Sequence, residues 1–119
     1  MNQSSREAII DLLFLSLYLD DHLSLAEDDV LSNALDRLGW DSLQPREAYV
    51  WKAFSGARGA YDSLEKVRAF IDERAETIIR DGGQAEALTW LTRVLGADGI
   101  SPTERHFLNR LEERFYPGA

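Results

Sequence analysis

The chain has 119 residues, of which 45% are hydrophobic, 29% are charged and none is cysteine. This length suits a single domain that buries its own core. The lack of cysteine excludes disulfides, thiolate metal sites and thiol nucleophiles, and it favours a reducing, cytoplasmic location. Acidic residues outnumber basic ones by 21 to 13, and the basic ones are scattered along the chain. A nucleic-acid partner is therefore not expected.

The first predicted helix is capped by Ser4 or Ser5 and ends near Leu19. Its apolar residues wrap most of the circumference, which predicts a central position in a helical bundle. The apolar stretch Ile9–Leu19 is interrupted by Asp11 and Ser16, and it is shorter than the roughly 20 residues that cross a bilayer. It also lacks the basic flank and cleavage site of a signal peptide. Membrane insertion is therefore not expected.

A second helix is expected to start after Ser24 and to end at Gly39, a residue type favoured just past a helix C-terminus. A third helix should begin around Pro45, which suits a first turn, and should be interrupted by Gly56 and Gly59. The predicted core-facing residues of these two helices are Val30, Leu31, Ala34, Leu35 and Leu38, then Tyr49, Val50, Ala53 and Phe54.

Three more helices follow. Asp62 and Glu65 resemble a capping box for the fourth, which we expect to fray or kink before the turn at residues 81–83. The fifth follows that turn, and Ser101 should cap the sixth with Pro102 at its first position. The predicted core-facing residues are Leu64, Val67, Phe70 and Ile71, then Leu88, Leu91, Val94 and Leu95, then Phe107, Leu108, Leu111 and Phe115.

No window alternates apolar and polar residues as a half-buried strand would. The fold class is therefore all-α, a single-domain bundle of about six helices over residues 1–119. An ungapped shift of 77 residues also aligns the chain with itself, over units of about 5–39 and 82–116. It places Asp21 on Asp98, Ser24 on Ser101, Glu27 on Glu104 and Arg37 on Arg114. Each unit is a helix, an acidic loop and a capped helix, which predicts an internal pseudo-two-fold repeat.

The segment Leu95–Glu104, LGADGISPTE, followed by Phe107, resembles the signature of the TerB-like family. That family includes the tellurite-resistance protein TerB and the N-terminal region of the DjlA co-chaperones, and its repeated motif is roughly Ala-Asp-Gly-x-Ile-Ser-x-x-Glu. The second loop is one residue shorter than this pattern. The first keeps the usual length only if Asp20 is the motif aspartate, which puts Asp21 where the family has glycine. The resemblance implies an all-helical bundle, acidic patches linked to divalent metal binding, and association with stress-response systems near the membrane.

Carboxylates of the two acidic loops are the candidate ligands of a divalent cation, calcium or magnesium, which prefers oxygen donors. These candidates are Asp20, Asp21, Glu27, Asp98 and Glu104. Neither loop has the ligand ladder of an EF-hand. Glu27 and Glu104 are also explained by reciprocal capping with the serine three residues earlier, which is the favoured interpretation. His22 lacks the usual zinc partners, so we interpret it as a solvated loop residue.

Six aromatic residues have two possible roles: Trp40, Trp51, Trp90, Tyr49, Phe54 and Tyr61. They could form an exposed surface for a partner protein, or they could pack in the core. Core packing is the favoured interpretation, because tryptophan and tyrosine are usually well buried. Trp40 is the expected exception, since it follows the helix-ending Gly39 and precedes a polar loop.

No phosphate-binding loop or nucleophile elbow occurs, so no catalytic residue is predicted. The leading hypothesis is a non-enzymatic TerB-like module for tellurite or stress resistance. It would bind a partner protein, for example in a membrane-associated stress complex, under control of a divalent cation at the acidic loops. Two alternatives remain open. One is a metal-independent scaffold or co-chaperone-like interaction domain, and the other is a carboxylate-based hydrolase, which requires a deep pocket with at least two carboxylates.

Overall fold

Six α-helices make up the computed structural model, which describes residues 1–19, 29–96 and 99–118 and leaves out the side chains of residues 29 and 30. The helices are α1 (Gln3–Leu19), α2 (Asp29–Leu38), α3 (Arg46–Ala60), α4 (Leu64–Asp81), α5 (Gln84–Leu95) and α6 (Pro102–Phe115). No strand occurs in these ranges, and the Cα radius of gyration is 13.1 Å. The prediction of an all-α, single-domain bundle is confirmed.

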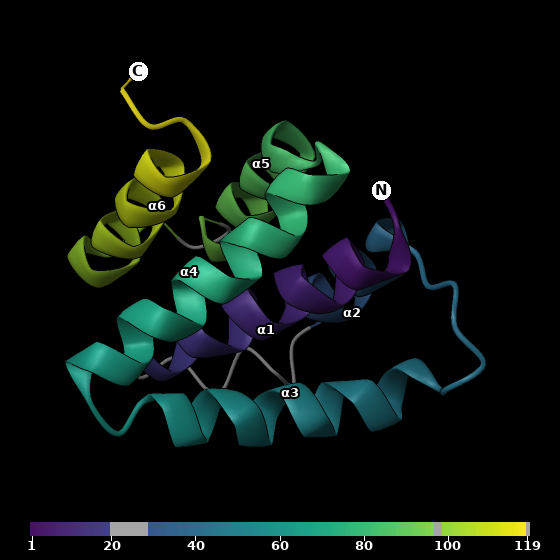
Figure 1. Ribbon diagram of the computed structural model, residues 1–119. Helices are drawn as coiled ribbons and strands as arrows, with labels where there is room; N and C mark the ends of the chain where they lie inside the picture. Colours follow the sequence, from purple (N-terminus) through teal and green to yellow (C-terminus); the bar gives the residue numbers. More distant parts are fainter. Residues whose placement is uncertain (20–28, 97–98, 119) are drawn as a thin grey trace.

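Helix α1 is the centre of the bundle, as its all-round apolar sequence predicts. It packs against α3 and α4 and also contacts α5 and α6. Figure 1 shows α1 and α4 between α3 at one edge of the molecule and α6 at the opposite side. The residues of α1 from Ala8 to Leu17 are all buried. None of the described helices is long and apolar enough to span a membrane.

The predicted cap of α1 was wrong. The backbone N–H of Ser5 donates to Oδ1 of Asn2 at 2.9 Å, and Ser5 itself is fully buried inside the first turn. Asparagine is as good a helix cap as serine, so Asn2, which precedes both predicted caps, takes this role. The start of α2 and the proposed cap at Ser24 lie outside the described residues.

Helix α3 continues through both glycines that were expected to interrupt it, and it ends at Ala60. Glycine costs a helix only about 1 kcal/mol relative to alanine, so it does not break a helix that packing supports. That support comes from Ala53 and Ala57, which are buried in the core. Pro45 stands immediately before the helix rather than inside its first turn.

Helix α4 departs from prediction at its start and along its length. Its cap is Ser63, whose hydroxyl accepts from the backbone N–H of Lys66 at 3.1 Å, while Asp62 pairs with the side chain of Lys66. Leu64, expected in the core, is 64% exposed. The helix runs unbroken to Asp81 and ends at Gly82, which adopts the left-handed conformation (φ 71°) that glycine favours at this position.

The arrangement of α5 and α6 agrees with the sequence. Ser101 caps α6, Pro102 is its first residue, and all four predicted core residues of α6 are buried. The contacts also fit the repeat, because α1 touches α6 and α5 touches α2. Helix α4 packs against both α1 and α6.

Candidate functional site

The predicted cation ligands fall mostly outside the described residues. Asp20, Asp21, Glu27 and Asp98 lie there, as does His22, and only Glu104 is placed. Within residues 1–19, 29–96 and 99–118, no group of three histidine, aspartate or glutamate side chains is arranged to hold a metal ion. The second histidine, His106, is exposed on α6.

Glu104 forms the capping box that the sequence predicts. Its Oε1 accepts from the backbone N–H of Ser101 at 2.9 Å, and its own N–H donates to the Ser101 hydroxyl at 3.1 Å. The side chain is only 1% exposed, and its second oxygen, Oε2, is buried without a hydrogen-bond partner in the described structure. A buried carboxylate oxygen without a partner is costly. Capping therefore accounts for one oxygen of Glu104 and not for the other.

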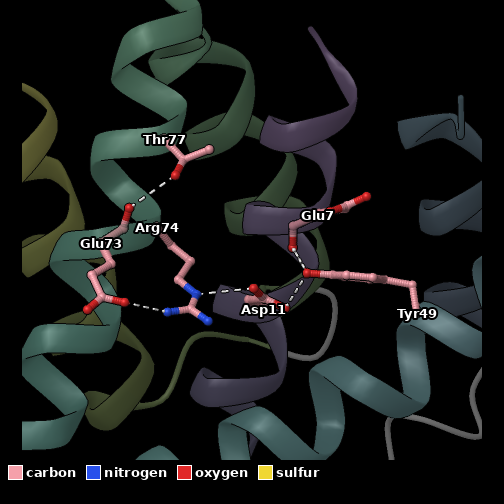
Figure 2. A network of polar contacts seen from close by, with 6 residues as sticks. All are labelled: Glu7, Asp11, Tyr49, Glu73, Arg74 and Thr77. Carbon is pink, nitrogen blue, oxygen red and sulfur yellow. Dashed lines mark hydrogen bonds and ion pairs between the residues drawn. The ribbon is translucent and has the colours of Figure 1, made fainter. Parts of the chain in front are cut away.

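A polar pocket of about 400 Å³ lies where α1, α3 and α4 meet. Its lining side chains include Glu7 and Asp11 of α1, Tyr49 of α3, and Glu73 and Arg74 of α4. Figure 2 shows Tyr49 and Arg74 reaching Asp11 from opposite sides. The pocket brings together charged and polar residues that lie far apart in the sequence.

Asp11 is the centre of this network. Its Oδ1 accepts from the Tyr49 hydroxyl at 2.9 Å, and its Oδ2 accepts from Nε of Arg74 at 3.1 Å. The guanidinium of Arg74 also lies 3.8 Å from the centre of the Phe70 ring. Both oxygens of the buried carboxylate thus have a donor, which is what a charge inside a helical core requires.

The same burial shifts the acid–base properties of the network. Desolvation raises the pKa of Asp11, and the hydrogen bonds from Tyr49 and Arg74 oppose this rise without cancelling it. The pKa of Tyr49 is also raised, first by burial and then by the nearby carboxylate of Asp11. Tyr49 therefore stays protonated and acts as a hydrogen-bond donor at physiological pH.

The remaining carboxylates of the pocket also have partners. Glu7 accepts from the side-chain amide of Gln3 at 3.0 Å, and Glu73 pairs with Arg74 at 3.0 Å. The pocket therefore contains the two or more carboxylates that a hydrolase would need, but each one already has a donor. Its most direct physical role is to fasten α1 to α3 and α4.

None of the protein-family models, curated proteins or solved structures compared with this chain matches it. The TerB-like resemblance therefore stays a prediction that depends on the two motifs.

The aromatic residues were assigned partly wrongly. Trp40, the expected exception, is half-buried, packs on Tyr49 and donates from Nε1 to the carbonyl of Gln44 at 2.7 Å. The exposed tryptophan is Trp51, with 69% of its surface accessible, and Tyr61 is 53% exposed. Trp51 projects from the outer side of α3, where no described helix covers it. The helical spacing of Trp51 from the buried Ala53 and Ala57 could have indicated this position.

Sequence reasoning did not identify the network around Asp11. Asp11 was noticed only as an interruption of an apolar stretch. A single carboxylate in a helix that is apolar on all sides has to be buried with a partner, and that was the available signal. The partners Tyr49 and Arg74 lie 38 and 63 residues away, beyond what local patterns can indicate.

Proposed function

We propose that this chain is a non-enzymatic, TerB-like helical module that binds a partner protein through the exposed aromatic side of α3. The observation that carries the proposal is Trp51, a large apolar side chain that is 69% exposed. Tryptophan and tyrosine dominate the binding energy of protein interfaces, because they bury a large area with few rotatable bonds. The resemblance to the TerB-like family suggests a partner in a membrane-associated stress-response system.

Trp51 belongs to a row of four aromatic side chains, the α3 aromatic row, formed by Trp51, Phe54, Tyr18 and Tyr61. Consecutive ring centres are 6.4, 5.1 and 6.1 Å apart. The two inner rings are half-buried and hold the two outer rings at the surface. An exposed apolar surface that is contiguous, rather than scattered, is typical of an interaction site.

The absence of an enzymatic role is supported by the network around Asp11. Both oxygens of Asp11 accept from side chains of neighbouring helices, so the carboxylate is held in place as a link between α1, α3 and α4. Tyr49 stays protonated, so it is no nucleophile. The network supports a rigid scaffold on which α3 presents its aromatic row.

Capture of partners by the immobilised protein from an extract of the source cells tests this proposal. The double variant Trp51→Ser/Tyr61→Ser should lose the partner that the wild type retains. The matched control is Leu43→Ser, because Leu43 is fully exposed in the loop between α2 and α3 and lies outside the aromatic row. Circular dichroism and thermal unfolding check that both variants stay folded. Equal capture by all three proteins would contradict the proposal.

A second candidate activity, a divalent cation bound at the acidic loops, is favoured by the buried Oε2 of Glu104. This oxygen lies at the start of α6 and has no hydrogen-bond partner in the described structure. A cation at the second loop would give it one, with Asp98 as a further ligand. The first loop would contribute Asp20, Asp21 and Glu27 in the same way. Calcium and magnesium are the expected ions, because all these ligands are oxygens.

Thermal unfolding with added calcium, and then magnesium, tests the cation. A cation with a micromolar dissociation constant should stabilise the protein by about 4 kcal/mol at millimolar concentration. Glu104→Gln is the sharpest variant, because glutamine keeps the capping hydrogen bond and removes the charge. It should abolish the stabilisation, whereas Glu112→Gln, on an exposed part of the same helix, should not. No shift in the wild type, or an equal shift in Glu104→Gln and Asp98→Asn, would leave capping as the role of Glu104.

A further inference from the structure

A groove of about 430 Å³ runs between α2 and α5, away from the aromatic row of α3. The α2 side contributes Ala34 and Arg37, and the α5 side contributes Trp90, Arg93 and Val94. The indole Nε1 of Trp90 donates to the carbonyl of Ala34 at 2.8 Å, which ties the two helices together beneath the groove. The groove therefore has a fixed, largely apolar floor.

Two arginines line this groove without a carboxylate partner. Arg37 and Arg93 are both exposed, and neither forms an ion pair within the described part of the chain. The protein as a whole carries a net charge of −8. The groove is also lined by one carboxylate, Glu86, so its two guanidinium groups leave a net positive charge, which attracts an anionic ligand.

The internal repeat shows what fits such a groove. Under the shift of 77 residues, α2 corresponds to α6 and α5 corresponds to α1, so the equivalent of the α2–α5 groove is the groove between α6 and α1. The residues equivalent to Ala34, Thr89, Trp90, Arg93 and Val94 are Leu111, Leu12, Leu13, Ser16 and Leu17. All five equivalents are at most 1% exposed. In the α2–α5 groove, by contrast, Thr89 and Arg93 are exposed and Ala34 and Trp90 are half-buried, and only Val94 is buried like its equivalent.

Helix α4 packs against both helices of the covered groove. It turns its apolar residues inward and places two carboxylates, Asp72 and Glu76, beside α6. Asp72 pairs with Arg110 at 3.5 Å, and Glu76 pairs with Arg114 at 3.5 Å. Arg114 is the equivalent of Arg37 in the open groove. The covered groove therefore binds an amphipathic helix with carboxylates at positions i and i+4.

We propose that the open α2–α5 groove binds an acidic amphipathic helix of a partner protein, in the way the α1–α6 groove binds α4. An apolar stripe would cover Trp90 and Val94, and carboxylates one turn apart would pair with Arg37 and Arg93. This site goes beyond the proposed function, because it is separate from Trp51 and would bind a different ligand, an acidic helix.

Two differences between the grooves define the ligand more closely. Asp11, which binds Arg74 of α4, corresponds to Leu88, an apolar residue of α5 outside the groove lining, so the ligand needs no arginine at that position. Arg110 corresponds to Asn33, which lines the groove and is uncharged, while Arg93 replaces the buried Ser16. In the covered groove both arginines belong to α6, whereas in the open groove one belongs to α2 and the other to α5. The ligand's carboxylates should therefore lie between Arg37 and Arg93.

A synthetic peptide derived from α4 tests the proposal. It has the sequence of residues 63–81 with Arg74→Leu, stabilised as a helix by a staple on its outer face. A second peptide also carries Asp72→Asn and Glu76→Gln, which removes the carboxylates and keeps the shape. Calorimetric titration of the wild-type protein should give binding that is about tenfold weaker for the neutral peptide. Arg37→Ala/Arg93→Ala should weaken binding of the acidic peptide by a similar factor.

Arg58→Ala/Arg68→Ala is the matched control, because it removes two exposed arginines of α3 and α4 that lie outside the groove, and it should bind as the wild type does. Trp51→Ser/Tyr61→Ser should also keep peptide binding, so loss of the α3 contact and loss of this site are distinguishable. No binding up to about 1 mM, or equal affinity for the two peptides, would overturn the proposal. Sedimentation showing a dimer that blocks the peptide would also overturn it, with a second copy as the occupant.

Discussion

The two units of the repeat bury their equivalent surfaces to very different degrees. Between α1 and α6 the equivalent wall residues are buried, α4 packs against both helices, and Arg110 and Arg114 pair with its carboxylates. Between α5 and α2 the equivalent surface is an open groove, and Arg37 and Arg93 have no ion pair in the part of the chain that is described. Related helices and loops thus form one groove that the chain itself fills and one that stays open.

This difference follows from a few side chains. Leu12, Ser16 and Ile9 of α1 are buried, whereas Thr89, Arg93 and Glu86 occupy the equivalent positions of α5 and line the groove. The second unit has larger or more polar side chains at these three exposed positions, and it keeps Trp90 and Val94 as an apolar floor. A repeat in sequence therefore predicts shared backbone structure, while the side chains decide which surface is left for a ligand.

Truncating one wall residue in each groove should give the largest contrast. Leu12→Ala removes a fully buried side chain and should lower the free energy of unfolding by about 2–5 kcal/mol. The equivalent change, Thr89→Ala, alters an exposed residue and should cost less than about 0.5 kcal/mol. Urea unfolding measures both. Similar losses would mean that the α2–α5 groove is covered as fully as the first.

The contact between Asp11 and Arg74 gives the next largest effect, because the second unit has Leu88 at the equivalent position. Asp11→Leu should cost about 1–3 kcal/mol, since it removes the closest acceptor of the Tyr49 hydroxyl and leaves the half-buried Arg74 with Glu73 alone. Asp11→Leu/Arg74→Leu should recover part of that loss, as apolar replacement of a buried ion pair often does. A thermodynamic cycle over the two positions measures the coupling, and a value of zero would show that Asp11 and Arg74 act independently.

The same carboxylate predicts a pH dependence that Leu88 cannot give. Burial raises the pKa of Asp11, so the folded protein holds this proton more tightly than the unfolded chain does. The stabilisation from that proton is fully present below the unfolded pKa and is lost as the pH rises through the folded pKa. As the pH rises from below the ordinary aspartate value of about 3.9 through the higher folded pKa, the wild type should therefore lose stability relative to Asp11→Asn. Urea titrations of both proteins at several pH values check the sign, and an opposite slope would contradict the assignment.

The smallest expected difference in stability is between alanine variants of the equivalent arginines, Arg114 and Arg37. Arg114→Ala breaks ion pairs with Asp72 and Glu76 that are partly exposed, so it should cost at most about 1 kcal/mol. Arg37→Ala breaks no described ion pair and should leave the stability of the free protein unchanged. Thermal unfolding at low and high salt measures the difference. If Arg37→Ala proved as costly as Arg114→Ala, Arg37 would already have a partner.

Much of the fold could be predicted from the sequence. The all-round apolar pattern placed α1 at the centre, and the capping box at Ser101 and Glu104 set the start of α6, because both depend on local spacing. Errors arose where tertiary packing outweighs local preference. The glycines at 56 and 59 did not interrupt α3, and Leu64 is exposed although its helical spacing suggested the core.

The candidate sites were harder to predict, because they are assembled from distant elements. The network around Asp11 joins three helices, and the α2–α5 groove depends on which surface α4 covers. The ungapped repeat contained the necessary comparison, since it pairs Arg37 with Arg114 and Trp90 with Leu13. Without knowing where α4 lies, the sequence could not show which of the two grooves is open.

The indole N–H signals of the three tryptophans provide the most direct test of the two-groove account. Nuclear magnetic resonance spectra of the ¹⁵N-labelled protein would be recorded during titration with the acidic α4-derived peptide. The account predicts that the Trp90 signal moves with peptide concentration while the Trp51 signal stays in place, because only Trp90 lies in the groove. Movement of Trp51 with an unchanged Trp90 would contradict it.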